Sequence, residues 1–97
     1  MKASKDIEEI LKRHKTELVK KYGVREIGVF GSCVRGEQSK RSDVDILVEF
    51  EEVPDLLTFI EMERYLENLL KKKVDLVEKT SLKPQLKNYI LNEVIFV

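Results

Sequence analysis

The sequence predicts one mixed α+β domain, in which a small mixed β-sheet is packed by helices. The chain has 97 residues, and a domain of about this size buries roughly 60–70% of the surface that its unfolded chain exposes. Three apolar runs with strand-like spacing alternate with three longer segments whose apolar residues recur at helical spacing. We therefore expect residues 1–97 to form a single domain around one core.

The charge balance and the cysteine count exclude several classes of function. Basic and acidic residues number 18 each, so no overall field draws the chain to nucleic acid or to anionic membranes. Direct nucleic-acid binding is therefore not expected. The single cysteine, Cys33, cannot form an internal disulfide. No apolar run approaches the ~20 residues of a membrane span and no signal peptide is recognisable, which predicts a cytoplasmic location without membrane contact.

The first predicted element is an amphipathic helix over residues 4–22. Ser4 is a suitable N-cap, and Gly23 offers the left-handed conformation that ends many helices. The apolar residues that recur at helical spacing are Ile7, Ile10, Leu11, Leu18 and Val19. Their shared face predicts one side of the core.

Residues 24–30 form the first predicted strand, and a short helical turn over residues 32–36 follows it. Ile27 and Val29 would share one face of the strand, since side chains two apart point the same way. Gly28 leaves room for another backbone to approach closely. Cys33, on the helical turn, is expected to fill a small space in the core.

The Gly-Ser pair at the end of this strand predicts a phosphate-binding turn. Gly31 followed by the hydroxyl of Ser32 at the start of a helical turn lets backbone N–H groups and the hydroxyl approach a phosphate. Arg35 either helps to neutralise phosphates or pairs with Glu37. A Gly-Ser pair by itself is usually an ordinary turn, so a phosphate-binding role is indicated only together with the Asp-x-Asp pair that follows after ten intervening residues.

A second strand is expected over residues 43–50, and it begins with two acids. Because side chains two apart share a face, Asp43 and Asp45 lie together, opposite an apolar face. That apolar face consists of Val44, Ile46, Val48 and Phe50. Two carboxylates so close repel each other unless a cation or a proton lies between them. Mg²⁺ takes oxygen ligands of this kind together with substrate phosphates, although an Asp-x-Asp pair by itself is more often a solvated strand edge.

The polar loop over residues 37–42 joins the two halves of this motif. It contains Lys40 and Arg41, and two interpretations stay open: a solvated loop, or one that contacts a triphosphate or an acceptor. Ser42 is expected to brace the turn before the first acid.

The next elements are a helix over residues 55–70 with Asp55 as its N-cap, and a third strand over residues 74–77. Tyr65 on the helix is assigned to packing. Asp75 is the acid of the third strand, and an unpaired carboxylate on an apolar strand needs a cation, a donor or water. If this strand lies beside the second, Asp75 completes a cluster of three acids; otherwise it is an exposed edge residue.

The last predicted element is a helix over residues 80–91, with Ser81 as a possible cap and Pro84 in its first turn, where the missing N–H costs little. Residues 94–97 are apolar and are expected to be buried against the core or against a partner. Phe96 makes an interface plausible.

A Gly-Ser pair, ten intervening residues and an Asp-x-Asp pair together form a signature. The residues of this signature are Gly31, Ser32, Arg35, Gly36, Ser42, Asp43 and Asp45, and the matching tail contains Leu82, Lys83, Pro84, Gln85, Leu86, Lys87, Ile90, Leu91, Glu93 and Val94. The pattern resembles the DNA polymerase beta-like nucleotidyltransferases. Within that superfamily it is most similar to the minimal nucleotidyltransferases, the MntA-type antitoxins that are paired with HEPN-domain toxins.

The resemblance implies a polymerase beta-like fold and an active site with two Mg²⁺ ions. Asp43 and Asp45 would bridge both ions, and Asp75 would bind the ion nearer the attacking hydroxyl and accept its proton. Gly31 and Ser32 would hold the β- and γ-phosphates of ATP. The implied reaction transfers AMP to a tyrosine hydroxyl of a cognate HEPN ribonuclease toxin, with which the chain would form a hetero-oligomer.

Two other functions stay open from the sequence. The first is a non-catalytic antitoxin that occludes the toxin, and the presence of all three acids with the Gly-Ser pair argues against it. The second is nucleotide transfer to RNA or to a small molecule. The absence of an accessory domain and of a strongly basic face argues against that second alternative.

Overall fold

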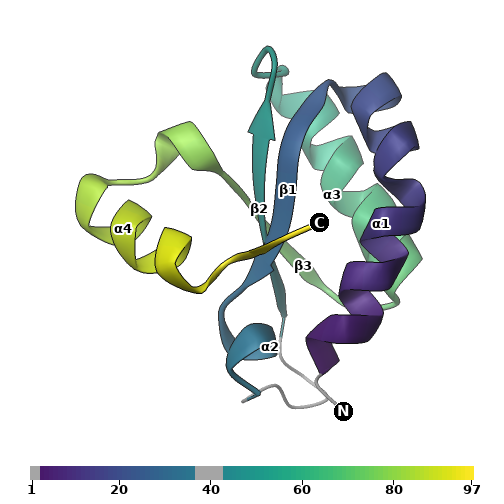
Figure 1. Cartoon of the computed structure of the whole chain (residues 1–97). Helices are drawn as coiled ribbons and strands as arrows, with labels where there is room; N and C mark the ends of the chain where they lie inside the picture. The colour runs from purple at the N-terminus through teal and green to yellow at the C-terminus, as the bar shows by residue number, and fades with distance from the viewer. Residues whose placement is uncertain (1–2, 37–42) are drawn as a thin grey trace.

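The computed structural model describes residues 3–36 and 43–97. Four strands form one sheet in the order β3, β2, β1, β4 (Figure 1). Strand β1 (Val24–Phe30) runs antiparallel to β2 (Val44–Phe50), whereas β2 runs parallel to β3 (Val74–Glu78). Strands that run parallel need a crossover connection, and α3 (Leu56–Leu70) supplies it between β2 and β3. The predicted α+β fold with a mixed sheet is confirmed.

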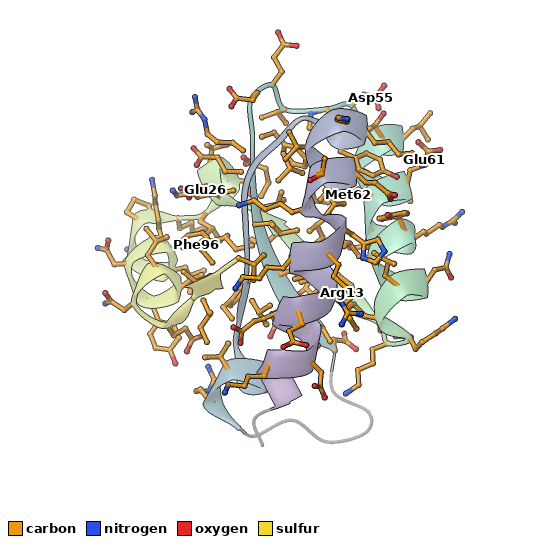
Figure 2. The ribbon with its side chains drawn as sticks, turned by 45° about the vertical axis from the view of Figure 1, so that its right-hand side comes forward. Arg13, Glu26, Asp55, Glu61, Met62 and Phe96 are labelled. Atoms are coloured by element: carbon orange, nitrogen blue, oxygen red, sulfur yellow. The ribbon has the colours of Figure 1, made fainter. Side chains whose placement is uncertain are left out.

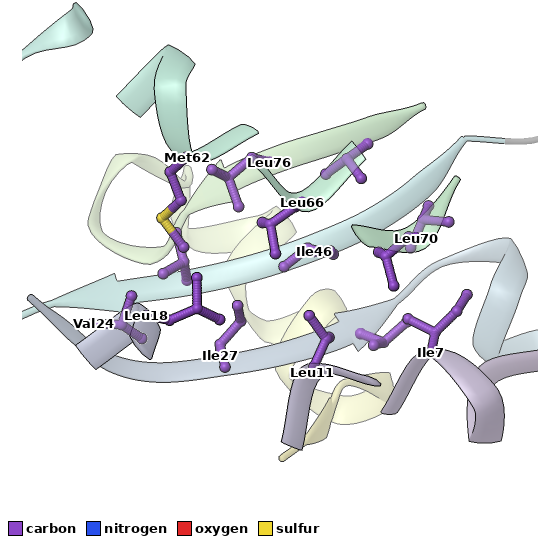
Figure 3. Packing of buried hydrophobic residues seen from close by; sticks show 14 of the residues in the cluster. Ile7, Leu11, Leu18, Val24, Ile27, Ile46, Met62, Leu66, Leu70 and Leu76 are labelled. Atoms are coloured by element: carbon purple, nitrogen blue, oxygen red, sulfur yellow. The ribbon is translucent and has the colours of Figure 1, made fainter. Parts of the chain in front are cut away.

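Helices cover the two faces of the sheet unequally. Figure 1 shows α1 (Ala3–Tyr22) and α3 on one side of the sheet and α4 (Pro84–Glu93) on the other. The larger core lies under α1 and α3 (Figure 3) and includes Leu11, Leu18, Ile27, Ile46, Met62 and Leu66. Full burial of each such side chain contributes about 1.5–3 kcal/mol. A smaller cluster of Phe30, Leu47 and Ile90 holds α4 against the opposite face.

Both ends of α1 test the sequence predictions. Gly23 ends the helix at φ +70°, and its N–H donates to the carbonyl of Val19 at 3.0 Å, so the predicted left-handed stop is confirmed. The predicted N-cap is wrong, because α1 already includes Ala3 and Ser4. A cap needs a non-helical backbone, and Ser4 lies within the helix.

The segment before α4 differs from the prediction of one helix over residues 80–91. Residues Lys79–Ser81 form a separate 3₁₀ turn, η1, and the Glu78 side chain accepts a hydrogen bond from the Ser81 N–H at 3.0 Å. Helix α4 begins only at Pro84, with Lys83 as its N-cap at an extended ψ of 146°. Proline disfavours helical backbone at the residue before it, so Ser81 cannot cap α4.

The apolar end of the chain adds a strand that the sequence did not predict. Ile95–Phe96 form β4, which pairs antiparallel with Gly28 and Val29 of β1. A Cβ atom on Gly28 would lie 2.8 Å from the carbonyl oxygen of Ile95, so the close approach predicted at Gly28 is confirmed. A pair of residues is too short to show the two-residue period of a strand. Phe96 remains 43% exposed and lies on the same side as α4 in Figure 2.

Asp55 caps α3 as predicted, and this contact has a testable pH dependence. Its carboxylate accepts a hydrogen bond from the Thr58 N–H at 2.8 Å, at the start of the helix (Figure 2). This bond lowers the pKa of Asp55. The stabilisation is therefore present above the ordinary pKa of 3.8 and is lost as the pH falls through the lowered pKa.

Replacing Asp55 by alanine should lower the melting temperature by a few degrees at pH 7, because the α3 N-cap is lost. The difference from the wild type should disappear in acid, where the wild-type carboxylate is also protonated. Thermal unfolding followed by circular dichroism measures both effects. Glu61→Ala, an exposed change in the middle of the same helix, is the control, and a D55A deficit that persists unchanged in acid would contradict the capping role.

No helix within residues 3–36 and 43–97 is long and apolar enough to cross a membrane.

Candidate active site

Neighbouring strands place two of the predicted acids side by side. Asp45 of β2 is paired in register with Asp75 of β3. Asp45 and Leu47 are two residues apart in β2, so their side chains point to the same face of the sheet. Leu47 packs against Ile90 of α4, and this face is therefore the one that carries α4. Asp43 directly precedes β2, and its carboxylate is close enough to raise the pKa of Asp45. The structure therefore brings all three predicted acids to one end of one face.

This end of the sheet stays open to solvent. Asp43 and Asp75 are exposed and Asp45 is half-buried. Asp75 belongs to the edge strand β3, so both descriptions offered by the sequence apply to it: it is an exposed edge residue and it lies beside Asp45. Among residues 3–36 and 43–97, no group of three or more Asp, Glu, His or Cys side chains is gathered tightly enough to hold a metal ion. The backbone assembles the three acids, but their side chains are not closed around one point.

Asp45 is the electrostatic centre of this group. Burial raises its pKa most, and the carboxylates of Asp75, Asp43 and Glu93 raise it further, whereas Arg35 lowers it. A carboxylate that is disfavoured in its charged form by neighbouring acids is stabilised by a cation. Perturbed acids in an open site are also common at functional centres. The set of oxygen donors suits Mg²⁺, which prefers carboxylates over nitrogen or sulfur ligands.

The Gly-Ser turn packs directly on this centre. Gly31 has φ +78° and ψ −151°, a conformation that glycine adopts far more easily than other residues. A Cβ atom at this position would overlap the carboxylate of Asp45. Glycine is required here both for the backbone conformation and for the approach of the acid to the turn.

The predicted helical turn after Gly31 is confirmed as α2 (Ser32–Arg35). The N–H groups of Val34 and Arg35 donate to the carbonyl of Gly31 at 3.0 and 3.1 Å. Cys33 is fully buried in the main core, and burial raises the pKa of its thiol. It is the core filler that the sequence predicted. The loop with Lys40, Arg41 and Ser42 lies outside the described residues.

A fourth acid, Glu93 at the end of α4, reaches the turn from the far end of the chain. Its carboxylate accepts a hydrogen bond from the Gly31 N–H at 2.8 Å and one from Arg35 Nη1 at 3.0 Å. The sequence offered phosphate binding or pairing with Glu37 for Arg35, and the structure adds Glu93 as its partner. Glu37 lies outside the described residues. Glu93 was not predicted as a site residue, since no spacing rule connects residues 62 positions apart.

A family model described as a nucleotidyltransferase domain matches residues 11–97. The chain belongs to this family. It is 61% identical over 92 residues to the protein adenylyltransferase MntA of Thermococcus cleftensis, covering 95% of this chain and 93% of that protein. The resemblance expected from the Gly-Ser and Asp-x-Asp signature is confirmed, and this chain is a nucleotidyltransferase.

Solved structures agree with the fold of this nucleotidyltransferase. A candidate minimal nucleotidyltransferase superposes with a TM-score of 0.75 at 37% identity, over 92% of this chain and 93% of that one. A toxin-antitoxin structure with AMP-PNP superposes with a TM-score of 0.73 at 25% identity, over 88% of this chain and 70% of that one. The predicted minimal nucleotidyltransferase fold is thereby confirmed.

Proposed function

We propose that this nucleotidyltransferase transfers AMP from ATP to a tyrosine hydroxyl of a HEPN-domain toxin, with release of pyrophosphate, and thereby silences the toxin. The observation that carries the proposal is the in-register pairing of Asp45 with Asp75 beside the Gly31 turn. A protein acceptor is supported by the adenylyltransferase name of the relative from Thermococcus cleftensis. A toxin as partner and an adenine nucleotide as ligand are supported by the related toxin-antitoxin structure with AMP-PNP.

The three aspartates would hold two Mg²⁺ ions. Asp43 and Asp75 are exposed, so their side chains can turn toward Asp45 without disturbing the core. When bound, such ions stabilise the charge of the triphosphate and favour ionisation of the attacking hydroxyl. A bound cation would stabilise the charged form of Asp45, because burial and three neighbouring carboxylates disfavour that form.

The turn and α2 would hold the triphosphate. The Gly31 N–H is already bonded to Glu93, so the phosphate contacts would come from the hydroxyl and N–H of Ser32. N–H groups in the first turn of a helix have no carbonyl partner within that helix. Arg35, at the other end of α2, would neutralise part of the phosphate charge. Asp75 would accept the proton of the tyrosine hydroxyl.

One observation favours a second function, occlusion of the toxin without catalysis. The acidic side chains in the described part of the chain are not gathered into a closed metal site. A domain that works only by binding has no need of such a site. The two functions differ in one measurable respect, the covalent state of the toxin.

Coexpression of this chain with the HEPN-domain toxin proposed as its partner, followed by intact mass spectrometry, tests the proposal. We expect the toxin to gain the mass of one or more AMP units and fragmentation to locate them on tyrosine. Coexpression with the Asp43→Asn, Asp45→Asn double variant is the control and should give unmodified toxin. A neutralised, tightly bound toxin without added mass would replace adenylylation by occlusion, and an active toxin with no bound partner would contradict both functions.

A further inference from the structure

We infer that Glu93 is a positioning residue for the nucleotide-binding turn, holding the Gly31 backbone and the Arg35 side chain in place for the triphosphate. The inference rests on the proposed function, since it assumes that this turn binds a nucleotide. It concerns a residue of α4, an element that carries none of the groups assigned to the reaction.

A single carboxylate joins two parts of the turn. Glu93 Oε2 accepts the Gly31 N–H at 2.8 Å, and Arg35 Nη1 lies 3.0 and 3.2 Å from the two carboxylate oxygens. Hydrogen bonds to a charged group are roughly twice as strong as those between neutral groups. Because both contacts end on one side chain, Glu93 fixes the backbone of Gly31 relative to the guanidinium of Arg35.

Glu93 is the more buried partner in its contact with Arg35, and in its contact with Gly31 it bonds a backbone of unusual conformation. Glycine loses more backbone freedom on folding than any other residue, and Gly31 is held at a positive φ of 78°. The Arg35 side chain is 40% exposed, whereas the Glu93 side chain is only 17% exposed. The more buried carboxylate therefore orients the more exposed guanidinium.

The helix that carries Glu93 is itself anchored. Ile90, one turn earlier in α4, is buried against Phe30 and Leu47 of the sheet. Phe30 immediately precedes Gly31, and Leu47 is two residues from Asp45. The position of the Glu93 carboxylate is thus set by the strands that carry the turn and the central acid.

A competing role for Glu93 predicts the opposite outcome. The Glu93 carboxylate occupies donors that a phosphate could use. If Glu93 competes with the phosphate for these donors, removing Glu93 would strengthen nucleotide binding. Positioning predicts that removal weakens binding, because a disordered turn must then be ordered by the nucleotide. The sign of the change in affinity separates the two.

Isothermal titration calorimetry with AMP-PNP and Mg²⁺ tests the inference. We expect Glu93→Ala to bind about tenfold more weakly than the wild type, and Glu93→Gln, which keeps an acceptor oxygen, to stay within about threefold. Asn92→Ala, an exposed change on the same helix, is the matched control and should bind like the wild type. Equal or tighter binding by Glu93→Ala, with the wild type binding normally, would overturn the positioning role. A wild-type chain with no affinity for the nucleotide would instead overturn the proposed function.

Amide hydrogen exchange of the nucleotide-free chain, followed by NMR, supplies a readout that does not depend on the reaction. The Gly31 amide should exchange at least about tenfold faster in Glu93→Ala than in the wild type, since its only described acceptor is removed. Protection should be largely retained in Glu93→Gln, and amides of the α3 core should be unchanged in both variants. Unchanged exchange at Gly31 in Glu93→Ala would contradict the geometry on which the inference stands.

Discussion

Asp45→Asn should lower the rate of nucleotidyl transfer by at least about 10³-fold, equivalent to about 4 kcal/mol of transition-state stabilisation. Asp45 is paired in register with Asp75 and is the acid that lies against the Gly31 turn, so we expect that Asp43 and Asp75 cannot replace it. Asparagine has nearly the same shape but no charge to offer a cation. Transfer of labelled AMP from ATP to the purified toxin measures the rate.

The same substitution should stabilise the metal-free fold at pH 7 by no more than about 1 kcal/mol, since partly exposed charges are screened by water. The pKa of Asp45 is raised by burial and by Asp75 and Asp43, so the charged form costs stability above that pKa. This cost is removed as the pH falls through the raised pKa. Urea unfolding in EDTA should therefore show a gain at neutral pH that shrinks in acid.

Asp6→Asn, an exposed change on α1, is the control for both measurements and should leave rate and stability near those of the wild type. Thermal unfolding with Mg²⁺ and AMP-PNP adds a third comparison. Ligands that bind only the folded state raise the melting temperature, so the wild type should shift and Asp45→Asn should not. An Asp45→Asn variant with substantial transfer activity would refute the assignment of this residue to the metal site.

Gly31→Ala should lower both activity and stability. A residue other than glycine is strained at φ +78° by about 1–3 kcal/mol, and the added methyl group would overlap the Asp45 carboxylate. We expect a loss of about 2 kcal/mol or more in the free energy of unfolding and a loss of about 10²-fold or more in transfer rate. Urea unfolding and the labelled-AMP assay measure the two quantities.

Gly23→Ala separates backbone strain from crowding of the site. Gly23 has a similar φ of +70°, but a Cβ atom there would meet nothing within 4 Å. Its replacement should cost about 1–2 kcal/mol of stability and leave the transfer rate of the folded protein close to that of the wild type. Equal activity in Gly31→Ala and Gly23→Ala would show that contact between the turn and Asp45 is unimportant for the reaction.

Local patterns predicted most of the elements because each depends on a short stretch of chain. The alternation of side chains predicted that Asp43 and Asp45 share the face of β2 opposite Val44, Ile46 and Val48, and apolar residues at helical spacing predicted α1 and α3. The end of α1 at Gly23 followed from one glycine. The first residue of α4 could not be predicted, because the sequence pattern was compatible both with a cap at Ser81 and with a start at Pro84.

The sequence by itself determined the two halves of the signature, the Gly-Ser turn and the Asp-x-Asp strand. Only the tertiary structure decided that Asp75 lies in register with Asp45 and that Glu93 holds Gly31. Periodicity describes which way a side chain points from its own element, and it carries no information on which element lies beside it. Which element lies beside which follows from burying both faces of the sheet. This burial brings β3 next to β2 and sets α4 across the end of β1.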